Sequence, residues 1–185
     1  EDEYRAYGFP FPAASTRIAE LREAATIVKT MWASSPASFQ GSYYQVADAY
    51  NEPRPNPVPK LMIGGGGEKL TLRVAAELAD WWNIGFCPVE EYERKLQRLA
   101  EHCAAVGRDP ATITKTYFAL VSVAEEPDKL ERRPTMSVLA GTPAEVAGQL
   151  ARFVELGVEH FQVRFLDFPE TRGAELFVEK VLPLL

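Results

Sequence analysis

Four consecutive glycines, Gly64 to Gly67, are the residues whose type and spacing most directly suggest a binding function. They follow a short apolar run and precede a segment with helical periodicity, so we expect them where a strand passes into a helix. Because glycine has no Cβ, the backbone there can approach a ligand closely. The first N–H groups of a helix have no partner within the helix and lie at the positive end of its dipole, which favours an anion such as phosphate.

Polar residues near the glycines are candidates for the same site. Thr71 would place a hydroxyl donor in the first turn of the helix, and Lys69 would add a positive charge. A carboxylate at Glu68 repels a phosphate unless it turns outward or caps the helix. Asn83, near the C-terminal end of the next strand, offers an amide to a cofactor or substrate, with a turn role as the alternative. The residues predicted to bind the cofactor are Gly64, Gly65, Gly66, Gly67, Glu68, Thr71 and Asn83, and no catalytic residue is predicted.

The glycine run differs from the two common nucleotide-binding motifs. In the GxGxxG spacing the third glycine would fall on Lys69, and no GK[ST] follows at P-loop spacing. Nicotinamide dinucleotides and nucleoside triphosphates are therefore disfavoured as ligands. The simplest alternative is that the glycines only form a tight turn, but four in succession exceed what turn chemistry needs.

Titratable side chains elsewhere do not form a metal site. His102 on a helix and His160 at the start of the last strand are expected to pack in the core or on the surface, and no metal is predicted. Cys87 and Cys103 lack CxxC spacing and are predicted to be reduced and packed. Arg164 on the last strand would face an anionic substrate group or, more simply, pair with an acidic neighbour.

Several aromatic residues have two interpretations. Trp81 and Trp82 are adjacent on a predicted strand and must point to opposite faces, so only one can face a cofactor. Tyr4 and Tyr7 either donate hydrogen bonds at the mouth of a site or anchor an exposed loop.

Hydrophobic periodicity predicts one helix followed by four strand–helix units. The first helix covers residues 18–32, with Ser15 or Thr16 as its cap, and a small hairpin follows around Gly41. Strands are predicted at residues 61–63, 81–86, within 113–123 and at 161–165, and helices at about 68–79, 88–106, 143–156 and 174–182. The third of these helices begins with a capping box at Thr142. This alternation predicts the α/β class, with a parallel sheet covered by helices. A complete (β/α)8 barrel needs about 250 residues, so the four strands form an open sheet or half a barrel.

Composition limits the class of protein. The net charge is −6, from 20 basic and 26 acidic residues, and the basic residues form no run, so we expect no nucleic-acid partner. No apolar stretch approaches the ~20 residues that cross a bilayer, and the acidic start, Glu1 to Glu3, is unlike a signal peptide. We therefore expect a soluble, cytoplasmic protein without a membrane partner.

Several segments resemble one enzyme family. Residues 59–73 (PKLMIGGGGEKLTLR) and 79–83 (ADWWN) resemble the bacterial-luciferase-like oxidoreductases, also called luciferase-like monooxygenases, especially their deazaflavin (coenzyme F420) dependent branch. Residues 2–12 (DEYRAYGFPFP) and 39–44 (FQGSYY) are similar to the same group. The resemblance covers nearly the whole chain in order.

The resemblance implies a (β/α)8 TIM barrel with its cofactor at the C-terminal mouth of the strands. It places residues 3–7 after the fourth strand, so residues 1–185 would be a single C-terminal half-barrel that supplies strands five to eight. It also implies an oxidoreductase that transfers hydride or activates oxygen at F420, with FMN as the alternative, on a small-molecule substrate. The residues around the reactive ring would lie largely in the other half, so the isolated chain is expected to have little activity.

Two alternatives remain at the level of sequence. One is a non-catalytic half-barrel that associates with a second copy; the other is a flavodoxin-like FMN electron carrier. In a half-barrel the first and last strands lack one neighbour each, so we expect a homo-oligomer, or closure by the N-terminal segment. Strand alternation places five apolar residues on the exposed inward face, namely Leu61, Ile63, Phe161, Val163 and Phe165.

Overall fold

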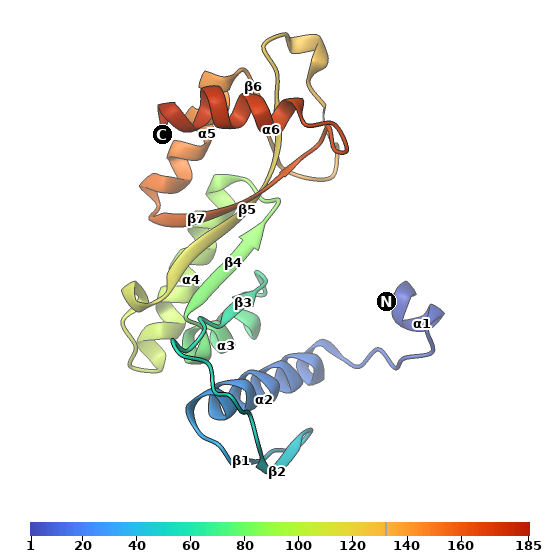
Figure 1. The fold of residues 1–185 in the computed structure, drawn as a ribbon, viewed down its shortest axis with the longest axis vertical. Coiled ribbons are helices and arrows are strands. Elements are labelled where there is room, and N and C mark those ends of the chain that lie inside the picture. The colour runs from blue at the N-terminus through green and yellow to red at the C-terminus, as the bar shows by residue number, and fades with distance from the viewer. Residues whose placement is uncertain (132) are drawn as a thin grey trace.

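The computed structural model describes residues 1–131 and 133–185. Its α-helices are α1 (Asp2–Ala6), α2 (Ala14–Ala33), α3 (Thr71–Leu78), α4 (Val89–Ala105), α5 (Pro143–Glu155) and α6 (Arg172–Leu176). Its strands are β1 (Ala37–Gln40), β2 (Gln45–Ala49), β3 (Met62–Gly64), β4 (Trp81–Gly85), β5 (Thr114–Val123), β6 (Val138–Gly141) and β7 (Val158–Phe165). After α6 the chain continues as a π-helical turn (Phe177–Val181) and a 3₁₀ turn (Leu182–Leu184). The predicted alternation of strands and helices is thus confirmed (Figure 1).

The main sheet is parallel, and its four principal strands follow chain order. β3 pairs with β4, β4 with β5, and β5 with β7. The short β6 also pairs with β5, beyond the end of β4 and opposite β7, so it continues the β4 edge. The sequence does not predict β6, because four residues next to a capping box are too few to show strand alternation.

The two faces of the sheet have different surroundings. Ile63 and Trp82 belong to the buried core, and Phe161 packs against it. Their strand neighbours point to the opposite, open face, where the amide of Gln162 lies 3.7 Å from the Met62 sulfur. A doubly wound sheet carries helices on both faces and reverses its strand order at a switch point. Chain order and a core on one face are instead typical of a barrel segment, which argues against the flavodoxin alternative.

The expected exposure of apolar strand residues is wrong. Ile63 is only 3% exposed, and its four companions in that prediction, Leu61, Phe161, Val163 and Phe165, pack against the core. Alternation divides a strand into two faces without saying which face the helices cover. The apolar stripes of the helices select the more apolar face, and the amphipathic face is left open.

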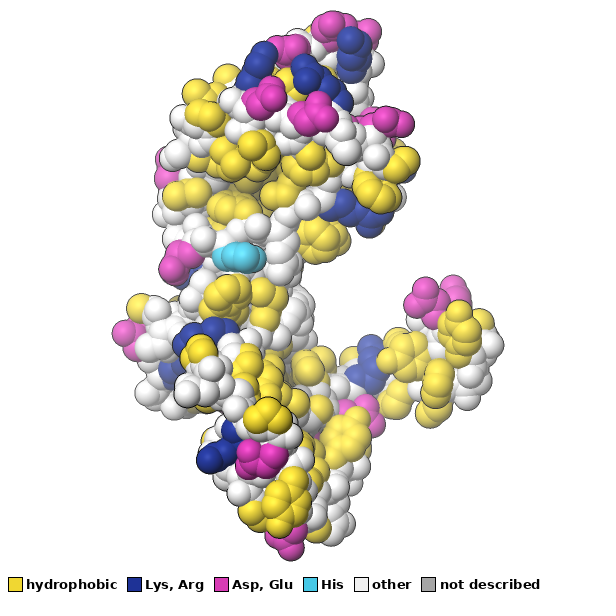
Figure 2. Space-filling view, viewed as in Figure 1, with side chains coloured by type: hydrophobic (Ala, Val, Ile, Leu, Met, Phe, Trp, Pro, Cys, Tyr) yellow, Lys and Arg dark blue, Asp and Glu magenta, His cyan; other side chains and the backbone are white. Residues whose placement is uncertain are grey.

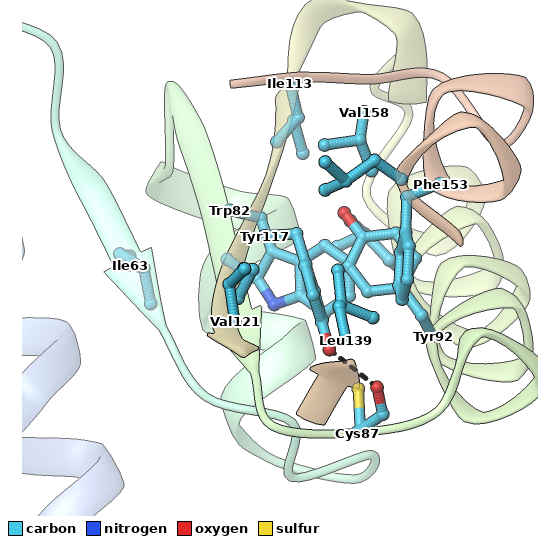
Figure 3. Close-up of a cluster of buried hydrophobic side chains, with 14 of the residues drawn as sticks. Ile63, Trp82, Cys87, Tyr92, Ile113, Tyr117, Val121, Leu139, Phe153 and Val158 are labelled. Carbon is cyan, nitrogen blue, oxygen red and sulfur yellow. Dashed lines mark hydrogen bonds between the residues drawn. The ribbon is translucent and has the colours of Figure 1, made fainter. Parts of the chain in front are cut away.

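An aromatic cluster forms the centre of the core (Figure 3). Tyr117 on β5 stacks on Phe153 of α5 with a centroid separation of 4.0 Å, and Tyr92 of α4 contacts Phe153 edge-on at 5.5 Å. Both tyrosine hydroxyls are satisfied: Tyr117 donates to the Cys87 carbonyl at 2.7 Å, and Tyr92 donates to the Thr116 carbonyl at 3.2 Å. The two hydrogen bonds join α4 to β5, and the ring contacts of Phe153 add α5 to the same packed unit.

The N-terminal third forms an arm and a hairpin beside the sheet (Figure 1). β1 and β2 form the predicted antiparallel hairpin, whose turn is held by Glu23 of α2 through the backbone N–H groups of Ser42, Tyr43 and Tyr44 at 2.8–2.9 Å. The predicted cap of α2 is wrong, because the helix starts at Ala14 and contains Ser15 and Thr16. No side chain caps the helix, which begins two or three residues earlier than a cap at Ser15 or Thr16 would imply.

Candidate anion-binding site

The glycine loop lies at the C-terminal end of β3 and leads into α3, as predicted. Gly64 is paired in register with Asn83 of β4, and Asn83 with Thr116 of β5. The Asn83 amide donates to the Thr116 hydroxyl at 2.7 Å, which in turn donates to the Trp82 carbonyl at 3.0 Å. The predicted residues Gly64 and Asn83 therefore lie side by side, and the Asn83 side chain is held in one orientation on the open face.

Each glycine has a different neighbourhood. A Cβ at Gly64 would have only the Asn83 carbonyl within reach, at 3.9 Å. Gly65 has a φ angle of +120°, a backbone conformation that residues other than glycine rarely adopt. A Cβ at Gly66 would lie 2.5 Å from Ile84 Cδ1, and one at Gly67 would lie 2.7 Å from Thr71 Oγ1. Only Gly64 is thus free of a constraint from the protein itself.

Several donors of the loop are free. Among residues 1–131 and 133–185, the backbone N–H groups of Gly66, Gly67 and Glu68 have no acceptor, and neither does the Thr71 hydroxyl. Gly65 N–H is used, since it donates to the Asn83 carbonyl at 2.9 Å. Three neighbouring N–H groups and a hydroxyl form the kind of donor set that binds phosphate oxygens.

Glu68 turns away from the loop toward α4. Its carboxylate lies 3.3 Å from Arg94, 3.7 Å from Lys95 and 3.8 Å from Arg98. These three cations compensate its charge, so a bound anion would meet its backbone N–H without facing a free carboxylate. The outward orientation is one of the two arrangements that the sequence left open.

Three side chains hold the loop from the protein side, and the sequence did not assign them to the site. The indole of Trp82 donates to the Gly65 carbonyl at 3.0 Å, and Lys95 donates to the Gly66 carbonyl at 2.8 Å. His102 Nε2 lies 2.7 Å from the Glu68 carbonyl. Lys95 interrupts the apolar stripe of α4, and a charged residue at a core-facing helix position is the signal that would have revealed it.

Other candidate residues are placed on the open face. Trp82 is fully buried, whereas the ring of Trp81 contacts that of His160 at a centroid distance of 5.0 Å and a tilt of 45°. Only one of the two tryptophans therefore faces the open side of the sheet, as alternation requires. Gln162 and Arg164 share that face with them. Arg164 is exposed, and within the described part of the chain it has no ion-pair partner, contrary to the simpler expectation.

Tyr4 and Tyr7 lie apart from the glycine loop. Tyr4 is on α1 and Tyr7 directly follows this helix, at the end of the arm that projects from the body (Figure 1). Tyr4 packs edge-on against Phe11, and Tyr7 is 79% exposed. Hydrophobic side chains are visible on the surface of this arm in Figure 2. The structure therefore does not bring these tyrosines to the predicted site.

Burial accounts for the state of the cysteines. Desolvation of the Cys87 thiol, reinforced by the nearby Glu91 carboxylate, raises its pKa to about 11. Burial also raises the pKa of Cys103. Both residues are free thiols in the core, as predicted, and neither is activated as a nucleophile.

Residues 1–136 match the family model of the luciferase-like monooxygenases, which is well over half of the 185-residue chain. The chain belongs to this family. One relative of this luciferase-like chain, the F420-dependent glucose-6-phosphate dehydrogenase of Microbacterium testaceum (strain StLB037), is 25% identical over 215 residues, which cover 96% of the chain and 64% of the relative. The chain thus spans less than two thirds of the length of that relative.

Two solved structures share the fold of this luciferase-like chain. An F420-dependent secondary alcohol dehydrogenase in complex with an F420–acetone adduct has a TM-score of 0.79 at 18% identity, covering 95% of this chain and 64% of that one. A riboflavin lyase with modified FMN and riboflavin has a TM-score of 0.77 at 14% identity, covering 98% and 60%. The chain therefore folds as half of a (β/α)8 barrel, as predicted.

No helix in the described ranges is both long and apolar enough to span a membrane.

Proposed function

We propose that this chain supplies the phosphate-binding loop and one wall of the active site of an F420-dependent oxidoreductase, with FMN as the alternative cofactor. The observation that carries the proposal is the set of free N–H groups of Gly66, Gly67 and Glu68 at the C-terminal end of β3. Barrel enzymes place their active sites at this end of the strands. The relative that is F420-dependent and the F420-containing neighbour favour the deazaflavin over FMN.

The residues present fit a phosphate. The loop N–H groups and the Thr71 hydroxyl would hold its oxygens, and Gly64 would leave space for it because only the Asn83 carbonyl lies near its absent Cβ. Lys69 is exposed in the same turn and would add a positive charge. Glu68 would contribute through its backbone, because its carboxylate is paired with α4.

The open face of the sheet would form the wall against which the cofactor and substrate lie. It carries Asn83, whose amide is fixed by Thr116, and the flat rings of Trp81 and His160. When bound, a deazaflavin or flavin supplies hydride-transfer or oxygen chemistry. The residues of this chain orient the cofactor through its phosphate and exclude water from one side of it.

A second candidate function is a non-catalytic half-barrel that associates with another copy. The observation that favours it is the absence of a second neighbour for β3 and for β7 within the described residues. Association does not require a phosphate, so ligand binding distinguishes the two candidates.

The test compares ligands with and without phosphate. Fluorescence titration of the chain should show tighter binding of F420 than of its phosphate-free deazaflavin chromophore, or of FMN than of riboflavin. Gly64→Val should abolish this preference, because its side chain would fill the space beside the loop, while the thermal midpoint stays within a few degrees of the parent. Equal affinity for both members of each pair in the parent chain would overturn the proposal.

A further inference from the structure

We infer that Trp82, Lys95 and His102 are positioning residues that orient the peptide groups of the glycine loop, so that its N–H groups face the ligand. This inference rests on the proposed phosphate-binding role of the loop. None of the three side chains needs to touch the cofactor. Each acts through a backbone carbonyl on the side of the loop that faces the core and α4.

The planar peptide group links carbonyl and N–H directions. In a trans peptide the C=O of one residue and the N–H of the next point in opposite directions. The bond from Trp82 to the Gly65 carbonyl therefore directs the Gly66 N–H away from the core, and the bond from Lys95 does the same for the Gly67 N–H. The contact of His102 with the Glu68 carbonyl turns the Lys69 N–H outward in the same way.

The environment of Lys95 shows that its charge interacts with groups of the protein itself. The residue is only 8% exposed, and a buried ammonium must have partners to offset its desolvation. Its Nζ lies 2.8 Å from the Gly66 carbonyl, 3.3 Å from Glu91 and 3.7 Å from Glu68. The ammonium thus has one hydrogen bond, to the loop carbonyl, and two carboxylates that balance its charge.

The geometry of α4 makes it a rigid support. Lys95 and His102 are seven residues apart, which is about two helical turns, so both project from the same face of the helix toward the loop. α4 is anchored in the core by Tyr92, Leu99 and Cys103, each at most 3% exposed. The indole of Trp82, fully buried on β4, provides the third fixed point. Preorganised donors of this kind bind an anion without a cost for ordering the loop.

The experiment removes one fixed point and measures the loop and the ligand preference separately. Lys95→Met keeps the aliphatic stem that packs under Gly66 but removes the ammonium. We expect ¹⁵N order parameters of Gly66 and Gly67 in the ligand-free chain to fall from about 0.85 toward 0.6. The preference for F420 over its phosphate-free chromophore should fall by about tenfold, the effect of one lost charge-assisted contact, while the affinity for that chromophore is unchanged.

The matched control is Arg98→Met on the same helix. Arg98 also lies near Glu68, at 3.8 Å, but makes no bond to a loop carbonyl, so order parameters and ligand preference should stay at the parent values. Should Lys95→Met fail to fold, His102→Phe should lower the order parameter of the Lys69 N–H and the preference for F420 over its phosphate-free chromophore, and His102→Gln, which retains a donor, should restore both. A general structural defect would instead lower the affinity for F420 and for its phosphate-free chromophore equally.

Two contrary results separate the inference from the function on which it rests. If the parent prefers the phosphate-bearing ligand and Lys95→Met keeps both that preference and a rigid loop, the positioning role is wrong and the proposed function stands. If the parent shows no such preference while Lys95→Met loosens the loop, the phosphate-binding function is wrong and the orientation of the loop by Lys95 stands.

Discussion

At the scale of single residues, the four glycines of the loop serve different purposes. Positions 66 and 67 have no room for a larger residue, because Ile84 and Lys95 lie against Gly66 and Thr71 lies against Gly67. Gly64 is the one whose missing side chain leaves open space. A substitution that tests ligand approach therefore belongs at Gly64, because one at Gly65 or Gly66 would also disturb the fold.

We predict that Gly66→Ala destabilises the chain by about 1–3 kcal/mol, the usual cost of overpacking. Its Cβ would lie 2.5 Å from Ile84 Cδ1 and 2.9 Å from Lys95 Cε. Gly148→Ala is the control, since Gly148 lies inside α5 with nothing within 4 Å, and it should stabilise by about 0.4–1 kcal/mol. Urea denaturation of both variants measures the difference. Equal stability of the two would contradict the close packing of Gly66.

The raised pKa of Cys87 predicts a loss of stability in alkali. Its pKa rises from 9.0 to about 11 on folding, so the folded state retains a proton that the unfolded state releases. The contribution of the protonated Cys87 thiol to the free energy of unfolding is complete below pH 9 and is lost as the pH rises to about 11. The shift is about two pKa units, so at about 1.4 kcal/mol per unit the stability lost is roughly 3 kcal/mol. The free energy of unfolding should therefore fall less steeply over this range in Cys87→Ala than in the parent; parallel pH profiles would count against the shift.

At the scale of elements, capping explains why α5 starts where it does. The Thr142 hydroxyl accepts from the Glu145 N–H at 3.4 Å, and the Glu145 carboxylate accepts from the Thr142 N–H at 2.7 Å. Backbone and hydroxyl donation from Thr142 lowers the pKa of Glu145. This reciprocal pair satisfies two donors at the start of the helix and was readable in the sequence as T-P-A-E.

We predict that Thr142→Ala lowers the stability of the chain by about 1 kcal/mol. Thr142→Ser keeps the hydroxyl and should stay within a few tenths of a kcal/mol of the parent, according to the similar ranking of these caps. Thermal denaturation followed by far-ultraviolet circular dichroism gives the comparison. The capping assignment fails if alanine and serine have the same effect.

At the scale of the whole molecule, the sheet ends on both sides without a neighbour. β3 pairs only with β4, and β7 only with β5, within the described residues. Unpaired strand edges are templates for association. The open face between them is amphipathic, carrying Met62, Trp81 and Gln162, so a partner would bury both the edges and this face.

We therefore expect the 185-residue chain to form a homodimer or higher oligomer at micromolar concentration. Light scattering measures the mass, and Met62→Asp on the open face should shift the equilibrium toward monomer. Glu155→Lys at the end of α5 is the control, because this residue is exposed on the outer side of a helix. A cooperatively folded monomer of 20.6 kDa would show that the edges need no second copy.

The sequence by itself determined the order of the principal helices and strands, without α1 and β6, and also the hairpin, the capping box and the position of the glycine loop. Each of these depends on interactions within a few residues, such as hydrophobic period, glycine at a strand end and the Thr142 cap. The family resemblance added the half-barrel, which the parallel strand order of β3, β4, β5 and β7 bears out.

Only the tertiary structure decided which face of the sheet is covered and which side chains hold the loop. Lys95 and His102 act on carbonyls 29 and 34 residues away, and Glu68 is paired with a helix that begins at Val89. Local patterns carry no record of such contacts, because they arise when α4 packs against β4 and the loop. A charged residue in an apolar helix stripe signals that a partner exists, but the packed structure alone shows that the partner is the glycine loop.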